Sequence, residues 1–367
     1  MKPSSLIARV STGSSLAETW TLRVPKAYII VLNWNGWRDT IECLESVFRL
    51  RYPDFRVVVC DNGSADGSIE QIKAWARGEI SVGARNEDLA HLTVPPVPKP
   101  IPFEELSAES ESKDSRSSSA RLILIQTGSN LGFAGGNNVG LRYALAQESC
   151  DFFWLLNNDT VVDPNALSAL VERMQQRPDV GMCGSTLLYY ENPRLVQALG
   201  GSVYNRWIAR GGHIGLGRNS DDLPSCDAVE SRMKYVQGAS MLVRREFLEQ
   251  IGLMSEAYFL YFDEIDWATR ARGKYSLAYA SQSVVYHKEG SAIGTSVDRA
   301  KRSTYSDYYA ARSRMLFTKR YFPLACLGVA AMLLGGSLFR YSAGNNSNAR
   351  AILRGLRDSL KGARRGQ

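Results

Sequence analysis

The fold is decided by residues 152–160, FFWLLNNDT, where an apolar run of strand length breaks into amides and one carboxylate. Asp163 and Pro164 then open a helical pattern. This order places Asp159 at the carboxyl end of a buried strand, the edge of an open α/β sheet where ligands collect, because helices begin there. A turn that only caps the next helix has a similar composition, so the other strand ends must decide between the two interpretations.

Composition limits the class of protein. The chain has 367 residues, of which 44% are hydrophobic and 22% charged, which is typical of a soluble globular protein. Its net charge is +7, and Arg and Lys near the carboxyl terminus supply much of the excess, which indicates an anionic surface or ligand. The first 23 residues hold no continuous apolar segment ahead of a cleavage site, which favours a cytoplasmic protein over a secreted one.

The cysteines support the same compartment. None of the six belongs to a Cys-x-x-Cys pair, and several lie inside apolar runs, so we expect reduced core residues and neither a zinc site nor a disulfide framework. They are Cys43, Cys60, Cys150, Cys183, Cys226 and Cys326.

The chain repeats a rhythm of apolar strand, polar loop and helix. Apolar strands are predicted at residues 27–32, 55–60, 121–125 and 152–156. This rhythm predicts a doubly wound, mostly parallel sheet with right-handed crossovers and helices on both faces. After Pro178 the strands become shorter and the loops richer in glycine, which predicts a mixed and more irregular second half.

Two segments depart from this rhythm. Residues 1–25 are rich in Ser and Thr, which predicts a flexible arm. Residues 79–119 hold a cluster of prolines followed by a run of Ser, Glu and Lys, which predicts a flexible insertion with no core of its own. The main domain is then expected to span residues 26–300, with the insertion inside it.

Residues 301–367 are predicted to be a helical extension. Residues 324–339 are apolar and flanked by basic residues, but a spanning helix needs ~20 residues, so we expect an element on the membrane surface or a re-entrant one. A buried core helix is the alternative. Residues 350–365 are basic and amphipathic, consistent with packing or with anionic lipid headgroups. Residues 319–365 are therefore expected to meet the inner face of the cell membrane.

Three polar clusters, at Asn33, Asp61 and Asp159, each follow an apolar strand, so a parallel sheet brings them to one edge. A glycine-rich loop at residues 132–136 lets the backbone approach a phosphate or sugar closely, and together these features favour a nucleotide-type site. The sequence has neither Gly-x-Gly-x-x-Gly there nor Gly-Lys-Ser/Thr, which argues against a dinucleotide dehydrogenase and a P-loop ATPase. We expect no nucleic acid partner.

The motifs resemble those of glycosyltransferase family 2, most closely its rhamnosyltransferase-like bacterial members. The resemblance covers residues 27–325 apart from the insertion, and its motifs occur in the family's order. They are VLNWNG at 31–36, VCDNGS at 59–64, NLGFAGGNN at 130–138, LNNDT at 156–160, QGA at 237–239, DEIDW at 263–267 and YHK at 286–288. The resemblance implies a GT-A fold that transfers a sugar from a nucleoside diphosphate with inversion.

The resemblance also implies a donor site. Asp61 matches the family's base-reading aspartate, whose carboxylate can accept the ring N–H of uracil or thymine. An Asx turn in Asp-Asn-Gly-Ser is the alternative role. The full set expected to bind the donor is Asn33, Asn35, Asp61, Gly132, Phe133, Gly135, Asn138 and Asn158.

A magnesium or manganese ion is expected beside the donor. Asp159 matches the last acid of the family's Asp-x-Asp motif, whereas the first acid is replaced by Asn157, a weaker ligand. Of the three histidines, His287 lies where the family places a metal-binding histidine. A structural histidine at a strand end is the alternative. The ion would act as a Lewis acid on the departing diphosphate.

The acidic motif is expected to supply the general base that inverting transfer requires. Glu264 falls at the family's base position, while Asp263 and Asp266 stay open as candidates. Acids that merely stabilise the first turn of a helix are the alternative. Gln237, Gly238 and Trp267 are predicted on the acceptor side.

These observations predict an inverting glycosyltransferase, with rhamnose as the candidate sugar and a glycan or lipid-linked acceptor in cell-surface polysaccharide synthesis. A sugar nucleotidyltransferase is one rival, but it should carry Arg and Lys in a glycine-rich loop after the first strand, and residues 33–36 supply no charge. A non-catalytic relative that binds glycan is the other, because Asn157 replaces an acid.

Overall fold

The computed structural model describes residues 23–107, 120–147, 150–288 and 302–361. Its main sheet contains ten strands. They are β1 (Ala27–Asn33), β2 (Phe55–Asp61), β3 (Phe103–Ser107), β4 (Leu122–Gln126), β5 (Phe152–Asn157), β6 (Thr160–Val162), β7 (Val180–Tyr189), β8 (Val196–Leu199), β12 (Ser240–Arg244) and β13 (Ser276–His287). Their order is β3-β4-β2-β1-β5-β12-β7-β13-β6, with β8 beside β7.

The sheet is parallel on one side and mixed on the other. Strands β3, β4, β2, β1 and β5 run parallel, whereas β12 is antiparallel to both β5 and β7. The predicted mostly parallel sheet with a mixed second half is therefore confirmed. A second sheet pairs β10 (Arg210–His213), β9 (Gly201–Asn205) and β11 (Tyr235–Val236) in that order.

Helices cover both faces of the main sheet. They are α1 (Trp37–Val47), α2 (Ser68–Arg77), α3 (Gly132–Leu145), α4 (Ala166–Gln176), α5 (Cys226–Glu230), α6 (Arg245–Ile251) and α7 (Asp263–Ala271). Alternate residues of β1 belong to different cores: Ile29 packs with residues of α1, α2 and α4, and Ile30 with residues of α3, α6 and α7. This alternation is what a strand buried on both faces requires.

The predicted insertion is wrong for residues 79–107. This segment contains the 3₁₀ helix η1 (Glu87–Leu92) and β3, which pairs with β4 as a parallel edge strand. Val97 and Ile101, which lie between the prolines, pack into the core beneath α1 and α2. Prolines are tolerated next to an edge strand, because an edge leaves some backbone groups outside the ladder. The described residues leave out 108–119 of the predicted insertion and 1–22 of the predicted arm at 1–25.

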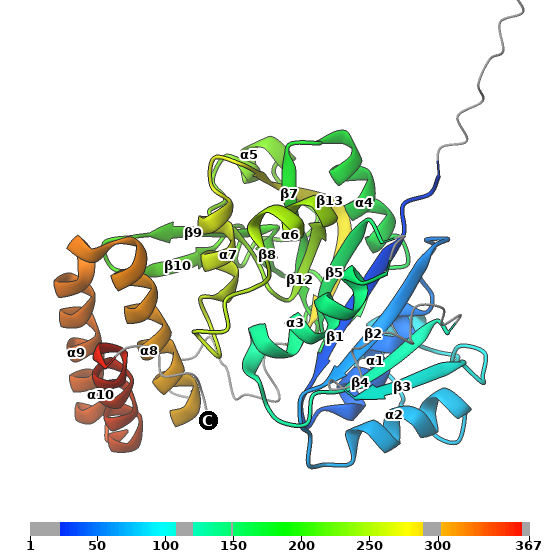
Figure 1. The fold of residues 1–367 in the computed structure, drawn as a ribbon, viewed down its shortest axis with the longest axis horizontal. Helices are drawn as coiled ribbons and strands as arrows, with labels where there is room; N and C mark the ends of the chain where they lie inside the picture. Colours follow the sequence, from blue (N-terminus) through cyan, green and yellow to red (C-terminus); the bar gives the residue numbers. More distant parts are fainter. Residues whose placement is uncertain (1–22, 108–119, 148–149, 289–301, 362–367) are drawn as a thin grey trace, which may run out of the picture.

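Three helices form a bundle at one end of the molecule, far from β3 and β4 (Figure 1). They are α8 (Thr304–Tyr321), α9 (Cys326–Ser342) and α10 (Asn346–Leu360), with the short 3₁₀ helix η4 (Pro323–Ala325) before α9. Met315, Val329 and Ile352 share a core with Ala209, which follows β9. Within the described residues, Pro323–Ser342 is long and apolar enough to cross a membrane by length and composition.

Candidate functional site

The ends of three parallel strands meet at one edge of the main sheet. Asn33 at the end of β1 pairs in register with Asp61 at the end of β2, and Leu32 pairs with Asn157 at the end of β5. The polar clusters that the sequence placed after these strands are therefore neighbours, as a parallel sheet dictates.

Hydrogen bonds fix Asp61 at this edge. Asn33 Nδ2 donates to Asp61 Oδ1 over 2.7 Å, and the Ser64 backbone N–H donates to Oδ2 over 3.2 Å. The second bond reaches the backbone N–H three residues on, whereas the Asx turn foreseen as the alternative reaches two residues on, so a different local turn orients this carboxylate. Asn33 Oδ1 accepts from Thr40 Oγ1 over 2.8 Å, and Thr40 Oγ1 accepts from Asn158 Nδ2 over 3.0 Å. This amide network holds the carboxylate in one orientation.

Asn35 joins the loops after β1 and β2. Its backbone N–H donates to Ser64 Oγ, and its Oδ1 accepts from the Ala65 N–H over 2.7 Å. Asn35 has φ 51°, a left-handed conformation that Asn adopts more readily than most residues. The sequence analysis missed Asn62, whose amide bonds Asn130 Oδ1 and the Leu131 N–H and so fastens the next loop to this one.

The glycine-rich stretch is not a loop as predicted, because α3 already begins at Gly132. A Cβ on Gly136 would lie 2.4 Å from Leu32 Cδ1, and one on Gly140 would lie 2.8 Å from Ile30 Cγ2. These glycines let α3 lie close against β1. Gly132 has φ +74° and meets the carbonyl of Phe259, which accepts a hydrogen bond from the Phe133 N–H.

Two predicted donor residues have packing roles in the structure. Asn138 is buried, donates to the Met254 carbonyl and accepts from the Met254 N–H, so its prediction as a donor contact is wrong. A Cβ on Gly135 would meet Leu131 Cβ at 2.7 Å, so this glycine also serves close packing. The amide of Asn138 thus bonds the backbone of Met254 and the carboxylate of Glu256, after α6.

Asp159 and His287 lie together at the same edge. Strand β13 pairs with β6 so that His287 lies opposite Thr160, and His287 Nε2 is 3.2 Å from Asp159 Oδ1. His287 Nδ1 is 2.8 Å from Gln197 Oε1. Because a Gln carbonyl oxygen only accepts, Nδ1 carries a proton, and Nε2 faces the Asp159 carboxylate.

An unprotonated His287 Nε2 and the Asp159 carboxylate oxygen are both acceptors. At this distance they repel each other unless a proton or a cation lies between them. A carboxylate oxygen with an imidazole nitrogen suits Mn²⁺, and Mg²⁺ is commonly held by one or two carboxylates plus substrate phosphates. Asn157 Nδ2 approaches His287 Nε2 to 3.5 Å, so the amide that replaces the first acid borders this pair. Within the described ranges no three His, Cys, Asp or Glu side chains gather as metal ligands.

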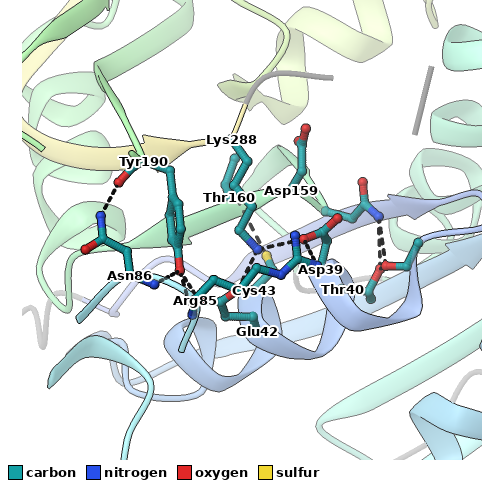
Figure 2. Close-up of polar contacts among 12 residues, drawn as sticks. Asp39, Thr40, Glu42, Cys43, Arg85, Asn86, Asp159, Thr160, Tyr190 and Lys288 are labelled. Atoms are coloured by element: carbon teal, nitrogen blue, oxygen red, sulfur yellow. Dashed lines mark hydrogen bonds and ion pairs between the residues drawn. The ribbon is translucent and has the colours of Figure 1, made fainter. Parts of the chain in front are cut away.

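A buried ion network lies next to this pair (Figure 2). Lys288 Nζ is 2.8 Å from Asp39 Oδ1 and 2.6 Å from Glu42 Oε2, and its side chain is 5% exposed. Tyr190 donates its hydroxyl to Glu42 over 2.5 Å, and Arg85 lies 2.9 Å from Asp39. The network joins α1 to the ends of β7 and β13 and to the loop before η1.

Backbone hydrogen bonds join this network to Asp159 and His287. The Lys288 N–H donates to the Asp159 carbonyl over 3.0 Å, and the Tyr190 N–H donates to the His287 carbonyl over 3.1 Å. Cys43 on α1 is also nearby, 3.6 Å from Thr160 Oγ1, but burial raises its pKa to about 12. The thiol therefore stays protonated and is no nucleophile.

Glu264 lies beside the end of β5. A Cβ on Gly238 would come within 2.3 Å of Glu264 Oε1, and the next residue, Ala239, accepts a hydrogen bond from the Asn157 N–H. The start of α7 is thereby brought to the same edge as Asp159 and His287. Burial raises the pKa of Glu264 above its ordinary range.

Asp263 is 1% exposed, and within the described residues neither of its carboxylate oxygens has a hydrogen-bond partner. Burial first, and then the negative charge of Glu264, raise the pKa of Asp263 well above its ordinary value. The backbone before it is strained, because Phe259, Tyr261 and Phe262 all have positive φ.

Two other predictions for this motif are wrong. Asp266 is fully buried and accepts hydrogen bonds from the hydroxyls of Tyr258 and Tyr321 and from Arg270 Nε, so it is a structural ion pair and not a base. Trp267 is fully buried in the core and donates Nε1 to the Gly252 carbonyl, so it cannot line an acceptor site.

Gln237 donates to Ser202 Oγ and is half-buried, so it bridges the main and small sheets near Gly238. The structure thus brings Asn33, Asp61, Asn158, Asp159, His287, Gly238 and Glu264 to one edge.

A mostly parallel sheet with its polar strand ends at one edge, and an acidic helix start facing that edge, define a glycosyltransferase of the GT-A class. The model of "Glycosyltransferase like family 2" matches residues 113–306, more than half of the chain, and that of "Glycosyl transferase family 2" matches residues 28–90. The chain belongs to glycosyltransferase family 2.

Two curated relatives resemble part of the chain. The low-salt glycan biosynthesis hexosyltransferase Agl10 of Haloferax volcanii is 29% identical over 151 residues, which are 40% of this chain and 45% of the relative. The N-acetylglucosaminyl-diphospho-decaprenol L-rhamnosyltransferase of Mycobacterium tuberculosis is 28% identical over 188 residues, 45% of this chain and 58% of the relative. The chain spans about half the length of the curated relatives it matches.

Among solved structures, the mannosyltransferase PcManGT of Pyrobaculum calidifontis, in complex with GDP-Man and Mn²⁺, is similar to the chain. The TM-score is 0.50 at 14% identity, covering 92% of this chain and 88% of the mannosyltransferase. At this identity the likeness establishes the shared GT-A fold and nothing finer.

Proposed function

We propose that the chain transfers a sugar, with inversion, from a thymidine or uridine diphospho-sugar to a lipid-linked or glycan acceptor of a cell-surface polysaccharide. L-rhamnose is the candidate sugar, because one relative is named as a rhamnosyltransferase acting on a decaprenol-linked sugar. The reaction belongs in the cytoplasm at the inner face of the cell membrane, where a soluble donor and a lipid-linked acceptor meet.

The observation that carries this proposal is the convergence of three carboxylates that are far apart in the sequence. Asp61 lies at the end of β2, Asp159 follows β5, and Glu264 begins α7 next to Gly238. Asp61 is held by Asn33 and the Ser64 N–H. Its carboxylate retains capacity to accept the ring N–H of a pyrimidine.

Asp159 and His287 are the residues that would hold Mg²⁺ or Mn²⁺, with the donor's phosphates completing the coordination. A bound cation supplies the neutralisation of charge on the diphosphate leaving group. Asn157 contributes an amide where a double-aspartate motif has a second carboxylate. The donor's phosphates therefore supply a larger share of the negative charge around the ion.

Glu264 is the general base of the proposal. It takes the proton of the acceptor hydroxyl as the hydroxyl oxygen attacks the anomeric carbon, while the diphosphate leaves from the opposite face of the sugar. Burial raises the pKa of Glu264 toward neutral pH. A general base is most effective when its pKa lies near the working pH. The same burial, and then the charge of Glu264, raise the pKa of Asp263.

A ligand panel with a matched variant tests the proposal. Purified protein is heated with thymidine, uridine and guanosine diphospho-sugars, with and without Mn²⁺, because a ligand at 100 times its Kd stabilises the native state by about 2.7 kcal/mol. We expect a pyrimidine donor with Mn²⁺ to raise Tm, and Glu264→Gln to keep that shift but lose turnover. Glu249→Gln on exposed α6 is the control. No shift with any pyrimidine donor refutes the proposal.

A further inference from the structure

Helix α9 has a face that is firmly held by the protein. Val329 and Leu333 are buried in the bundle core, and Ser337 Oγ donates to the Ala349 carbonyl of α10 over 2.9 Å. Arg340 forms an ion pair of 2.8 Å with Asp307 of α8, and both side chains are less than 10% exposed. A helix held by polar contacts and a buried ion pair remains with the bundle, so α9 is not a free membrane-crossing segment.

The opposite face of α9 is apolar and uncovered. Leu324, in η4 just before α9, and Leu327, Leu334 and Leu338 of α9 are exposed by 88%, 86%, 50% and 68%. Their spacing of three, seven and four residues places them in one stripe opposite Val329 and Leu333. No charged residue occurs between Leu324 and Phe339. A soluble surface helix carries polar residues on its outer face, so this stripe indicates contact with an apolar phase.

An exposed tryptophan borders the stripe on one side. The tip of the β9–β10 hairpin packs against α9, because the Trp207 carbonyl would lie 3.5 Å from a Cβ on Gly328. Trp207 is 55% exposed and Ile208 41% exposed, whereas Ala209 is buried in the bundle core. Tryptophan is enriched where a membrane meets water, because its ring is apolar and its N–H remains hydrated.

Basic residues are exposed on both elements that pack against α9, the helix α10 and the β9–β10 hairpin. On α10, Arg350, Arg354 and Arg357 follow each other at intervals of four and three residues and are exposed, so they form one row along the helix. Arg206 and Arg210 are exposed on the hairpin. The single acid of α10, Asp358, accepts from Tyr308 and pairs with Arg357. The two elements that pack against α9 thus both carry exposed positive charge.

We propose that this face, the α9 stripe with the hairpin tip and the arginine row of α10, docks the enzyme on an anionic lipid bilayer. The leucines and Trp207 enter the boundary of headgroups and acyl chains, and the arginines contact acidic headgroups. A second copy is the less suitable occupant, because two such faces would bring rows of arginine against each other. The docking is independent of the proposed donor and acceptor.

Vesicle co-sedimentation of the full-length protein tests the docking. Vesicles of phosphatidylcholine alone and of phosphatidylcholine with phosphatidylglycerol are compared. We expect binding only to the second kind, weakening as salt increases. Leu334→Gln combined with Leu338→Gln should lower the partition at least ~10-fold, and Arg350→Ala combined with Arg354→Ala by a similar factor. Leu216→Gln is the matched control, because Leu216 is also 50% exposed but lies outside this face.

Three outcomes would overturn the docking. They are equal binding to both kinds of vesicle, no binding by a monomer, and a dimer in light scattering that the Leu334 variant dissociates. Donor binding and turnover on a soluble acceptor, measured without vesicles, should be unchanged in all of these variants. A wild-type protein that turns over the donor but does not bind vesicles would be a failure of this proposal alone, whereas vesicle binding without turnover would be a failure of the proposed function alone.

Discussion

Replacing Lys288 by Met removes the cation that two buried acids share. Glu42 is 1% exposed, and its Oε2 lies 2.6 Å from Lys288 Nζ, while Asp39 lies 2.8 Å from the same atom. Breaking a buried ion pair on one side costs about 3–5 kcal/mol. Arg85 still neutralises Asp39, and Tyr190 still donates to Glu42, so we expect the lower value, about 3 kcal/mol.

Thermal unfolding measures this cost. At about 2–4 °C per kcal/mol for a domain of this size, Lys288→Met should lower Tm by roughly 6–12 °C. Adding Glu42→Gln removes the unpaired charge and should restore part of the loss, because a neutral amide is cheaper to bury than a carboxylate. Lys73→Met is the control, since Lys73 pairs with Glu70 and Glu105 at the surface, where such pairs contribute less than about 1 kcal/mol. A Lys288→Met protein as stable as the control, or one that Glu42→Gln destabilises further, refutes the reasoning.

Three further predictions concern the site itself. Glu264→Gln should lower kcat by about 10²–10⁴-fold in a transfer assay while donor affinity stays unchanged, and a variant with full kcat would exclude this base. His287→Ala should raise the Mn²⁺ concentration for half-maximal rate at least ~10-fold, whereas a structural histidine would lower Tm and leave the metal dependence unaltered. The free energy of unfolding of Asp263→Asn should increase relative to that of the wild type as pH rises above 3.8. The increase is about 1.4 kcal/mol for each pH unit, until the pH reaches the raised pKa of Asp263. The sign follows because the folded wild type holds a proton that the unfolded chain releases, and equal Tm values from pH 4 to 8 would contradict it.

The sequence predicted the parallel part of the sheet because its signal is local. Each apolar run ends in polar residues, and parallel strands bring such ends to one edge whatever connects them. Asp61 and Asp159 lie at the same edge for that reason, whereas α7 follows no strand of the sheet and its start is placed there by the contact of Glu264 with Gly238. The sequence did not predict the edge strand β3, because its register is set by pairing with β4. Val97 and Ile101, the core residues before it, follow no period of two or of 3.6 residues.

The misassigned acids carried a signal that was overlooked. In a helix that begins at Asp263, residues three and four positions apart share a face, so Asp266 and Trp267 face inward with Asp263, and Asp266 lies one turn from Arg270. Glu264 lies on another face. The glycines of α3 mislead for a different reason, since glycine marks a loop and a close helix–sheet contact equally well, and only the partner strand distinguishes them.

The ion network of Lys288 could not be read from any local pattern, because Lys288 and Asp39 are 249 positions apart. Its place in the fold nevertheless follows from strand geometry. Successive residues of a strand point to opposite sides, so at the end of β13 His287 turns to Asp159 while Lys288 turns to the acids of α1. The Lys288 N–H also binds the Asp159 carbonyl, so the ion pair that anchors this strand end fixes both residues that would hold the cation. Lys288 is buried and paired with two acids. We therefore infer that it supports the strand end and keeps His287 Nε2 within 3.2 Å of Asp159 Oδ1 before any ligand binds.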